Sequence, residues 1–103
     1  MLLVNIEEIP GKKFEVLGLV KGSIVQSKHV GKDILAGFKT IVGGEIKVYT
    51  EVLTEARQIA TKRMVDEAKA LGADAVLRVT YESASIMSGA AEVIAYGTAV
   101  KFV

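Results

Sequence analysis

The chain has 103 residues, the length of one small domain, and its 13 basic and 12 acidic side chains give a formal net charge of +1. This even balance, with only three Tyr, three Phe and no Trp, excludes a nucleic-acid-binding surface as the default, and the absence of cysteine excludes disulfides and thiolate metal sites. We therefore expect a single domain over residues 1–103 with no nucleic-acid partner.

The first residues lack the pattern of a targeting signal. Residues 1–4 are apolar, but this run is too short for a secretory signal core and is followed by Glu7 and Glu8. No apolar run in the sequence approaches the roughly 20 residues that span a bilayer. We expect a soluble, cytoplasmic protein that has no membrane partner.

A strand is predicted over residues 14–25, after a turn at Pro10 and Gly11. Alternation places one set of side chains on one face: Phe14, Val16, Gly18, Val20, Gly22 and Ile24. It places Leu17, Leu19 and Val25 on the other. Both faces are partly apolar, so each needs cover, and the two glycines within the strand predict curvature or a close backbone approach.

A short helix is predicted next, with Asp33 as its N-cap. Its apolar residues recur at helical spacing: Ile34, Leu35, Phe38, Ile41 and Val42. Gly43 and Gly44 end it. Because free backbone N–H groups at a helix start can hold an anion, Gly43 and Gly44 are candidate ligand-binding residues, although tight turns explain them more simply.

The longest predicted element is an amphipathic helix that follows Tyr49 and stops at Gly72. Its apolar face is formed by residues three and four apart: Val52, Leu53, Ala56, Ile59, Ala60 and Met64. Glu51 and Glu55 in the first turns and Lys69 in the last suit the helix dipole, and Gly72 can close the helix in a left-handed conformation.

Two charged residues, Arg63 and Glu67, fall inside the apolar sector of this helix, one turn apart. Buried charges are costly unless they are paired. We expect the two side chains to pair with each other, or across a subunit interface, at the margin of the apolar face. The less favoured interpretation is a functional site, which Tyr49 would complete.

Two further strands are predicted, over residues 75–81 and 91–103, joined by a connection of small residues at 83–89. The last strand is apolar on both faces: Ile94, Tyr96, Val100 and Phe102 on one, and Val93, Ala95, Gly97 and Ala99 on the other. The predicted fold is α+β, with a three-stranded, mainly antiparallel sheet packed on one long helix, plus the short helix.

Six short motifs follow one another along the chain: Ile41-Val42-Gly43-Gly44, Tyr49, Glu55-Ala56-Arg57, Glu67-Ala68, Leu71-Gly72-Ala73-Asp74-Ala75-Val76 and Gly97-Thr98-Ala99-Val100. This ordered set resembles the YbjQ-like family. The resemblance implies a dodecin-like strand-helix-strand-strand subunit that assembles into a closed ring. It implies no known activity, because the family carries only a heavy-metal-binding label.

The residue types do not favour that label. Heavy metals prefer thiolate, thioether and imidazole ligands, whereas this chain has no Cys, a single His and three scattered Met. We interpret His29 as a loop histidine. The sequence therefore predicts no metal site, no cofactor and no tight zinc, copper or cadmium binding.

Half of the residues are hydrophobic, and the last strand has one apolar face to spare. We therefore expect a homo-oligomer, a ring of about five copies, that binds a small ligand or ion between subunits. The weak candidates for ligand binding are Gly43, Gly44, Tyr49, Arg63 and Glu67. The alternatives are an enzyme with an interface site built from Tyr49, Arg63 and Glu67, or a purely structural assembly module; no nucleophile-base pair identifies a catalytic residue.

Overall fold

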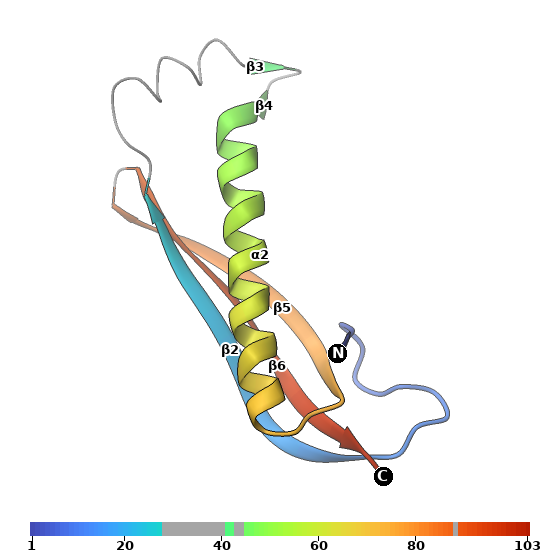
Figure 1. Ribbon diagram of the computed structural model, residues 1–103. Helices are drawn as coiled ribbons and strands as arrows, with labels where there is room; N and C mark the ends of the chain where they lie inside the picture. Colours follow the sequence, from blue (N-terminus) through green and yellow to red (C-terminus); the bar gives the residue numbers. More distant parts are fainter. Residues whose placement is uncertain (28–40, 43–44, 88) are drawn as a thin grey trace.

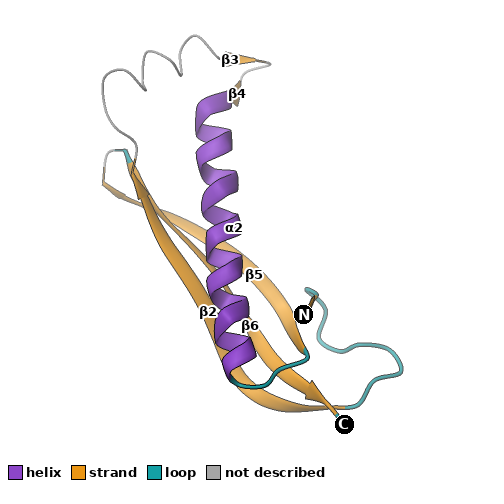
Figure 2. Cartoon of the chain, in the orientation of Figure 1, coloured by secondary structure: helices purple, strands orange, loops and turns teal. Residues whose placement is uncertain are grey.

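The computed structural model describes residues 1–27, 41–42, 45–87 and 89–103. Its elements, in chain order, are β1 (Leu2–Leu3), β2 (Phe14–Ser27), β3 (Ile41–Val42), β4 (Glu45–Ile46), α2 (Lys47–Ala70), β5 (Ala75–Met87) and β6 (Ala90–Phe102). One long helix lies across one face of a twisted sheet (Figure 1, Figure 2). Within the described ranges, no helix is long and apolar enough to cross a membrane.

The main sheet has four strands in the order β1-β5-β6-β2. β1 runs parallel to β5, and the other pairs are antiparallel, so the sheet is mixed. The α+β class is confirmed, but the expectation of three strands misses β1. Only two residues form that strand, and hydrogen bonds of Val4 with Val76 and Val79 continue the pairing. So short an element leaves no periodic signal in the sequence.

The β5–β6 hairpin is longer than predicted. β5 continues past Tyr81 to Met87, which pairs with Ala90 of β6. Ser83, Ala84 and Ser85 are small residues typical of loops, but a full-length partner strand supplies their backbone hydrogen bonds. The predicted pairing of the last two strands is confirmed, and the predicted loop at 83–89 is wrong over residues 83–87.

The short helix is wrong at its C-terminal end. Ile41–Val42 form β3, which pairs antiparallel with β4 at Glu45–Ile46. Two adjacent apolar residues fit a strand as well as a helix, so periodicity could not distinguish them. The rest of the predicted helix, with Asp33, lies outside the described residues, as do Gly43 and Gly44.

Helix α2 ends as predicted and begins earlier than predicted. Gly72 has a φ of +80° and its N–H donates to the carbonyl of Lys69, so the helix closes at this glycine. Because the helix begins at Lys47, its first turn contains no acidic residue, and the expectation for Glu51 and Glu55 is wrong. Lys69 does lie in the last turn.

The main core lies between α2 and the strands β2 and β6. Ala56, Ala60, Met64 and Ala68 recur every four residues and are fully buried. They pack on Val20, Val93, Ala95 and Ala99, so the small set of β6 faces the helix. At Gly22 an added Cβ would lie 2.3 Å from the carbonyl oxygen of Ala60, which confirms the predicted close approach.

A second cluster lies on the opposite face of the sheet. Ala75, Leu77 and Val100 are buried there, covered by Val4, Ile9, Phe14 and Phe102. The segment that follows β1 therefore covers part of the face that the sequence left spare. Val93 and Val100 are both buried within one chain, at 2% and 0% exposure, so neither marks an intersubunit face.

Irregularities in β2 and β5 change which side chains share a face. The register with β6 shifts between Val16 and Gly18, whose φ is +139°. Leu17 therefore packs on the helix side with Ile24, while Phe14 lies on the opposite side, the reverse of the prediction. β5 shifts between Leu77 and Thr80 in the same way, around Arg78 with a φ of +52°. Simple alternation cannot anticipate a bulge.

A candidate binding cleft between α2 and β5

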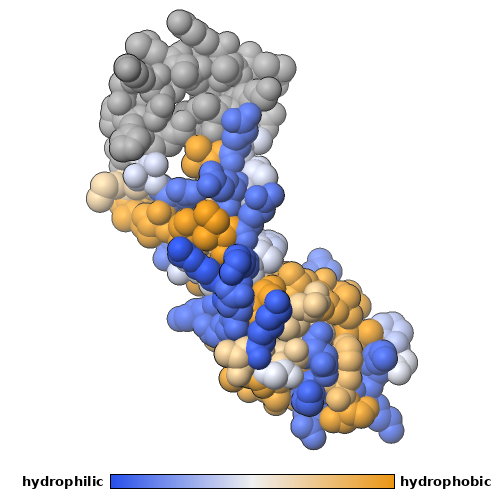
Figure 3. All heavy atoms as spheres, in the orientation of Figure 1, coloured by the Kyte–Doolittle hydropathy of each residue, from blue (hydrophilic) through white to orange (hydrophobic). Residues whose placement is uncertain are grey.

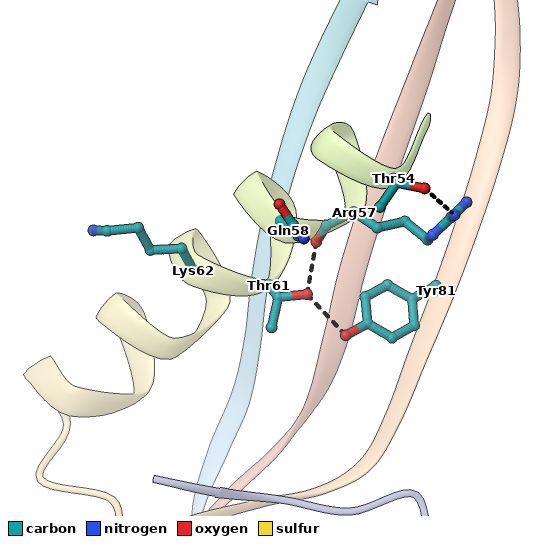
Figure 4. Close-up of a pocket in the computed structure, with 6 residues that line it drawn as sticks. All are labelled: Thr54, Arg57, Gln58, Thr61, Lys62 and Tyr81. Atoms are coloured by element: carbon teal, nitrogen blue, oxygen red, sulfur yellow. Dashed lines mark hydrogen bonds between the residues drawn. The ribbon is translucent and has the colours of Figure 1, made fainter. Parts of the chain in front are cut away.

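The helix does not cover the sheet evenly. It packs mainly on β2 and β6 and leaves much of β5 open on the helix side. A cleft of about 510 Å³ lies between α2 and β5 (Figure 4). Its lining residues are Thr54, Arg57, Gln58, Thr61, Lys62 and Tyr81. All come from the helix except Tyr81, whose ring projects from β5 toward the helix.

A chain of hydrogen bonds connects the helix to Tyr81. The Thr61 hydroxyl donates to the backbone carbonyl of Arg57 at 2.7 Å and lies 2.8 Å from the Tyr81 hydroxyl. Nη2 of Arg57 donates to the Thr54 hydroxyl at 3.2 Å. Thr54, Arg57 and Thr61 are spaced three and four residues apart, so one flank of the helix carries all of them. The cleft is therefore lined by an ordered polar array.

The two cations of the cleft differ in their partners. Nζ of Lys62 forms an ion pair with Asp66 at 2.8 Å, and this hydrogen bond lowers the pKa of the Asp66 carboxyl below its ordinary value. Arg57 forms no ion pair with any carboxylate of the described residues. Arg57 is therefore the cation of the cleft that is free to meet an anion.

A second hollow of about 210 Å³ adjoins the cleft and shares two of its residues. It is lined by Leu53, Arg57, Tyr81, Glu82, Ser83 and Val93. The carboxylate of Glu82 accepts a hydrogen bond from the Tyr96 hydroxyl at 3.1 Å, which raises the pKa of Tyr96. Glu82 keeps its negative charge when it accepts this hydrogen bond, and it forms no ion pair with Arg57. The second hollow adds apolar surface from Leu53 and Val93.

The residues suggested by the sequence lie elsewhere or outside the described ranges. Gly43 and Gly44 are outside them, and Tyr49 is described only as backbone within α2. Arg63 and Glu67 do not line the cleft and do not pair with each other, so the predicted mutual pairing is wrong. Both side chains are exposed at the opposite flank of the helix.

Arg63 and Glu67 bind the backbone of β2 instead. Nη1 of Arg63 donates to the carbonyl of Ser23 at 2.7 Å. The N–H of Lys21 donates to Oε1 of Glu67 at 3.3 Å. Because β2 is an edge strand, these are backbone groups that its outer edge would otherwise expose. The two charges have a structural use at the sheet edge.

Arg57, Thr61 and Tyr81 are not predicted as a group from the sequence. The signal that could have found the helical part is a polar flank at spacing three and four, from Thr54 through Arg57 to Thr61. Nothing local to the sequence connects that flank to Tyr81, 20 residues from Thr61 along the chain. Only the seating of the helix on β2 and β6 brings the two together.

The described residues do not fit a heavy-metal site. Among them, no three His, Asp or Glu side chains come together. Met64 is fully buried in the core, whereas Met1, before β1, and Met87, at the end of β5, are surface residues. His29 lies outside the described residues. Soft or imidazole donors are therefore not assembled in this part of the chain, and we derive no chemistry through a metal.

Comparisons with known proteins give a consistent result. A family model described as YbjQ, "putative heavy-metal-binding", matches residues 1–103. The chain is 63% identical over 101 residues to a UPF0145 protein of Clostridium novyi, with 98% of both chains covered. It is 59% identical over 103 residues to a UPF0145 protein of Alkaliphilus metalliredigens, with 100% of both covered.

A solved structure supports the fold. The crystal structure of a protein with unknown function from Pediococcus pentosaceus, of the DUF74 family, superposes with a TM-score of 0.67. The alignment covers 100% of this chain and 98% of that one, at 13% identity. At this identity the likeness concerns the fold alone. The family model that matches the whole sequence and the relatives at 59–63% identity show that the chain belongs to the YbjQ family.

Proposed function

We propose that this protein is a non-enzymatic homo-oligomer that binds a small ligand in the cleft between α2 and β5, next to a neighbouring subunit. One observation carries the proposal: Arg57 lies without a carboxylate partner among the described residues, beside the 44%-exposed Tyr81, in a cleft of about 510 Å³. An arginine and a tyrosine held in an open cleft are the residue types that binding sites use to orient ligands.

Assembly is supported by the open edge of β5. β1 and the residues after it pair with β5 as far as Val79, and beyond that point no described strand pairs with its outer edge. Such an edge is a template for another strand, and closed rotational symmetry leaves none unpaired. A ring of about five copies remains our proposal on the strength of the family resemblance.

Exposed apolar side chains support the same conclusion. Several of them lie on β2, at Val16, Leu19 and Val25, and near the end of the β5–β6 hairpin, at Ile86 and Met87. Figure 3 shows hydrophilic side chains along the helix and hydrophobic surface on either side of it. A monomer would leave this surface in water, which soluble proteins usually avoid.

The order β2, α2, β5, β6 is compatible with a dodecin-like strand-helix-strand-strand subunit, to which β1 is an addition, and we propose that relationship. Binding is favoured over catalysis because the cleft is lined by Thr, Arg, Gln, Lys and Tyr. None of these side chains has an ordinary pKa near neutral pH, where a general base works best. The cytoplasmic location stays a prediction.

The test combines mass measurement with two matched lysine variants. Light scattering after size exclusion should give a mass several times the 11.0 kDa of the chain. Ala84→Lys, on the open part of β5, should lower that mass, because lysine on an edge strand opposes pairing. Ala70→Lys, the same substitution at the exposed last residue of α2, should not.

Native mass spectrometry of the untreated wild type completes the test, because it shows subunit number and retained ligand together. A retained small molecule that is lost in Tyr81→Ala would support binding in the cleft. A wild type that runs as a stable monomer would contradict the assembly, and retention unchanged in Tyr81→Ala would contradict the location of the site.

A further inference from the structure

We infer that the α2–β5 cleft takes a small organic carboxylate whose anionic group binds Arg57 and which offers a hydroxyl or amino donor to Tyr81. This inference rests on the proposed binding function and adds the chemical class of the ligand. It follows from the charges and the hydrogen-bond directions of the residues that line the cleft and the adjoining hollow.

The charge of the cleft favours an anion. The charged side chains among its lining residues are Arg57 and Lys62, both positive. The adjoining hollow adds the carboxylate of Glu82, which forms no ion pair with Arg57. Lys62 is paired with Asp66, whereas Arg57, among the described residues, donates a hydrogen bond only to the neutral Thr54 hydroxyl. A guanidinium has five donors in a planar fork, which matches the two oxygens of a carboxylate. The remaining donors of Arg57 are therefore available for an anionic group.

A single unpaired cation favours a carboxylate over a phosphate. A phosphate monoester carries a charge of about −1.5 to −2 near neutral pH and usually meets several cations or helix N–H groups. Arg57 supplies one positive charge, and Asp66 holds the other cation of the cleft. A singly charged carboxylate therefore matches what the cleft provides.

The directions of the hydrogen bonds define the second polar contact. The hydroxyl of Thr61 has one proton, which it donates to the backbone carbonyl of Arg57. The bond between Thr61 and Tyr81 must then run from the Tyr81 hydroxyl to Thr61. Because the Tyr81 hydroxyl proton is used in this hydrogen bond, the oxygen of Tyr81 can act only as an acceptor toward a ligand in the cleft. A ligand satisfies this oxygen with a hydroxyl or amino group.

The adjoining hollow accounts for the organic part of the ligand. Arg57 and Tyr81 line both hollows, and Leu53 and Val93 add apolar surface to the smaller one. A ligand whose carboxylate meets Arg57 can therefore bury a ring or short alkyl group against these two residues. Burial of such a group adds affinity in proportion to the apolar area removed from water.

The experiment uses the assembled wild-type protein and three probes of similar size: benzoate, neutral benzamide and 3-hydroxybenzoate. Binding is measured by calorimetry, with the side-chain Nε signal of Arg57 followed by NMR. Benzoate should bind at least about tenfold more tightly than benzamide, because charged hydrogen bonds contribute about 1.5–3 kcal/mol. Inorganic phosphate, added as a competitor, should displace benzoate only weakly.

Two variants separate the roles of the residues, with a third as control. Arg57→Gln should weaken benzoate about 10- to 100-fold, because it removes the cation and keeps a polar side chain. Lys69→Gln removes an exposed cation of the same helix that lines neither hollow, and it should change affinity less than about threefold. Tyr81→Phe should weaken 3-hydroxybenzoate more than benzoate.

The possible results distinguish this inference from the proposed function. Equal binding of benzoate and benzamide, both lost in Tyr81→Ala, would overturn the anion inference and leave the binding function standing. Displacement of benzoate by phosphate at low concentration would overturn the choice of a carboxylate. An equal loss for benzoate and 3-hydroxybenzoate in Tyr81→Phe would overturn the donor to Tyr81. No binding by any probe, with no ligand retained in native mass spectrometry, would overturn both proposals.

Discussion

The backbone groups on the outer edges of β2 and β5 have different partners. On β2, side chains of the helix bind the outward-facing backbone: Arg63 holds the carbonyl of Ser23, and Glu67 holds the N–H of Lys21. On the outer edge of β5, the N-terminal residues pair only as far as Val79, and beyond Val79 this edge has no described partner, although β6 pairs with the inner edge. One edge is thus partly covered by side chains of the same subunit, and the other is open to a neighbour or a ligand.

This difference follows from where the helix is seated. The alanines of α2 and Gly22 of β2 let the helix approach β2 closely, which brings Arg63 and Glu67 within reach of that edge. The same seating withdraws the helix from β5 and creates the cleft at Tyr81. The covered edge of β2 and the open cleft at Tyr81 thus both follow from the position of α2 on the sheet.

The largest expected effect comes from disturbing that seating. Gly22→Val would place a Cβ 2.3 Å from the carbonyl oxygen of Ala60 and the N of Met64, both backbone atoms that cannot turn aside. We expect a loss of more than about 3 kcal/mol in the free energy of unfolding, or failure to fold, measured by urea denaturation. The hydrogen bonds of Arg63 and Glu67 with the backbone of β2 would also be lost.

The control is another glycine with a different constraint. Gly11 has a φ of +77° and nothing within 4 Å of an added Cβ. Gly11→Ala should therefore cost only the conformational strain, about 1–2 kcal/mol. Equal stability of Gly22→Val and wild type would show that the helix does not rest on Gly22 in solution.

A smaller effect is expected when Arg63 and Glu67, which bind the outer edge of β2, are replaced and the helix is left in place. In Arg63→Ala with Glu67→Ala, the backbone groups of Lys21 and Ser23 lose their partners. Each lost hydrogen bond should cost about 0.5–1.5 kcal/mol, because both side chains are exposed and water replaces them in part. The amide of Lys21 should exchange faster in hydrogen-exchange NMR, and a freed edge should promote further association.

The matched control removes the same charges from the same helix without touching the sheet. Lys62→Ala with Asp66→Ala breaks an exposed ion pair one turn apart on α2. It should leave the exchange rate of Lys21 unchanged. If both double variants change the exchange rate of the Lys21 amide equally, Arg63 and Glu67 do not protect the edge of β2.

Local pattern was sufficient for the helix and for most of the sheet. The spacing of Ala56, Ala60 and Met64 predicted the buried face, and Gly72 predicted the helix end. Arg63 was assigned to the same sector on a helical wheel, but the wheel does not show that the helix is seated off-centre. At the edge of the buried stripe, a long side chain reaches the surface.

Long-range pairing decided what local pattern could not. The serines near Ser83 look like a loop until β6 pairs with them, and β1 is too short to show a period. The bulges at Leu17 and Arg78 reverse the facing of their neighbours. The cleft was unpredictable for the same reason, since Thr61 and Tyr81 come from different elements and meet only in the folded chain.

The smallest expected effect tests whether Lys62 is held in its ion pair with Asp66 and is therefore unavailable to a ligand in the cleft. The hydrogen bond from Lys62 lowers the pKa of Asp66 below the ordinary 3.8, so the folded state favours the ionised carboxylate. The stability from this pair should be fully present above the unfolded pKa and lost as the pH falls through the lower folded pKa. Because both side chains are exposed, the change is small.

The measurement is a carboxyl-detected NMR titration of Asp66 in wild type and in Lys62→Gln. Removal of the lysine should move the pKa of Asp66 upward, toward its ordinary value, because the donor of its hydrogen bond is gone. Arg57→Gln, which removes a cation of the cleft that does not touch Asp66, should leave that pKa where it is. An upward shift of the pKa of Asp66 in Arg57→Gln as large as in Lys62→Gln would mean that both cations stabilise the Asp66 carboxylate. The distinction between a paired Lys62 and a free Arg57 would then be wrong.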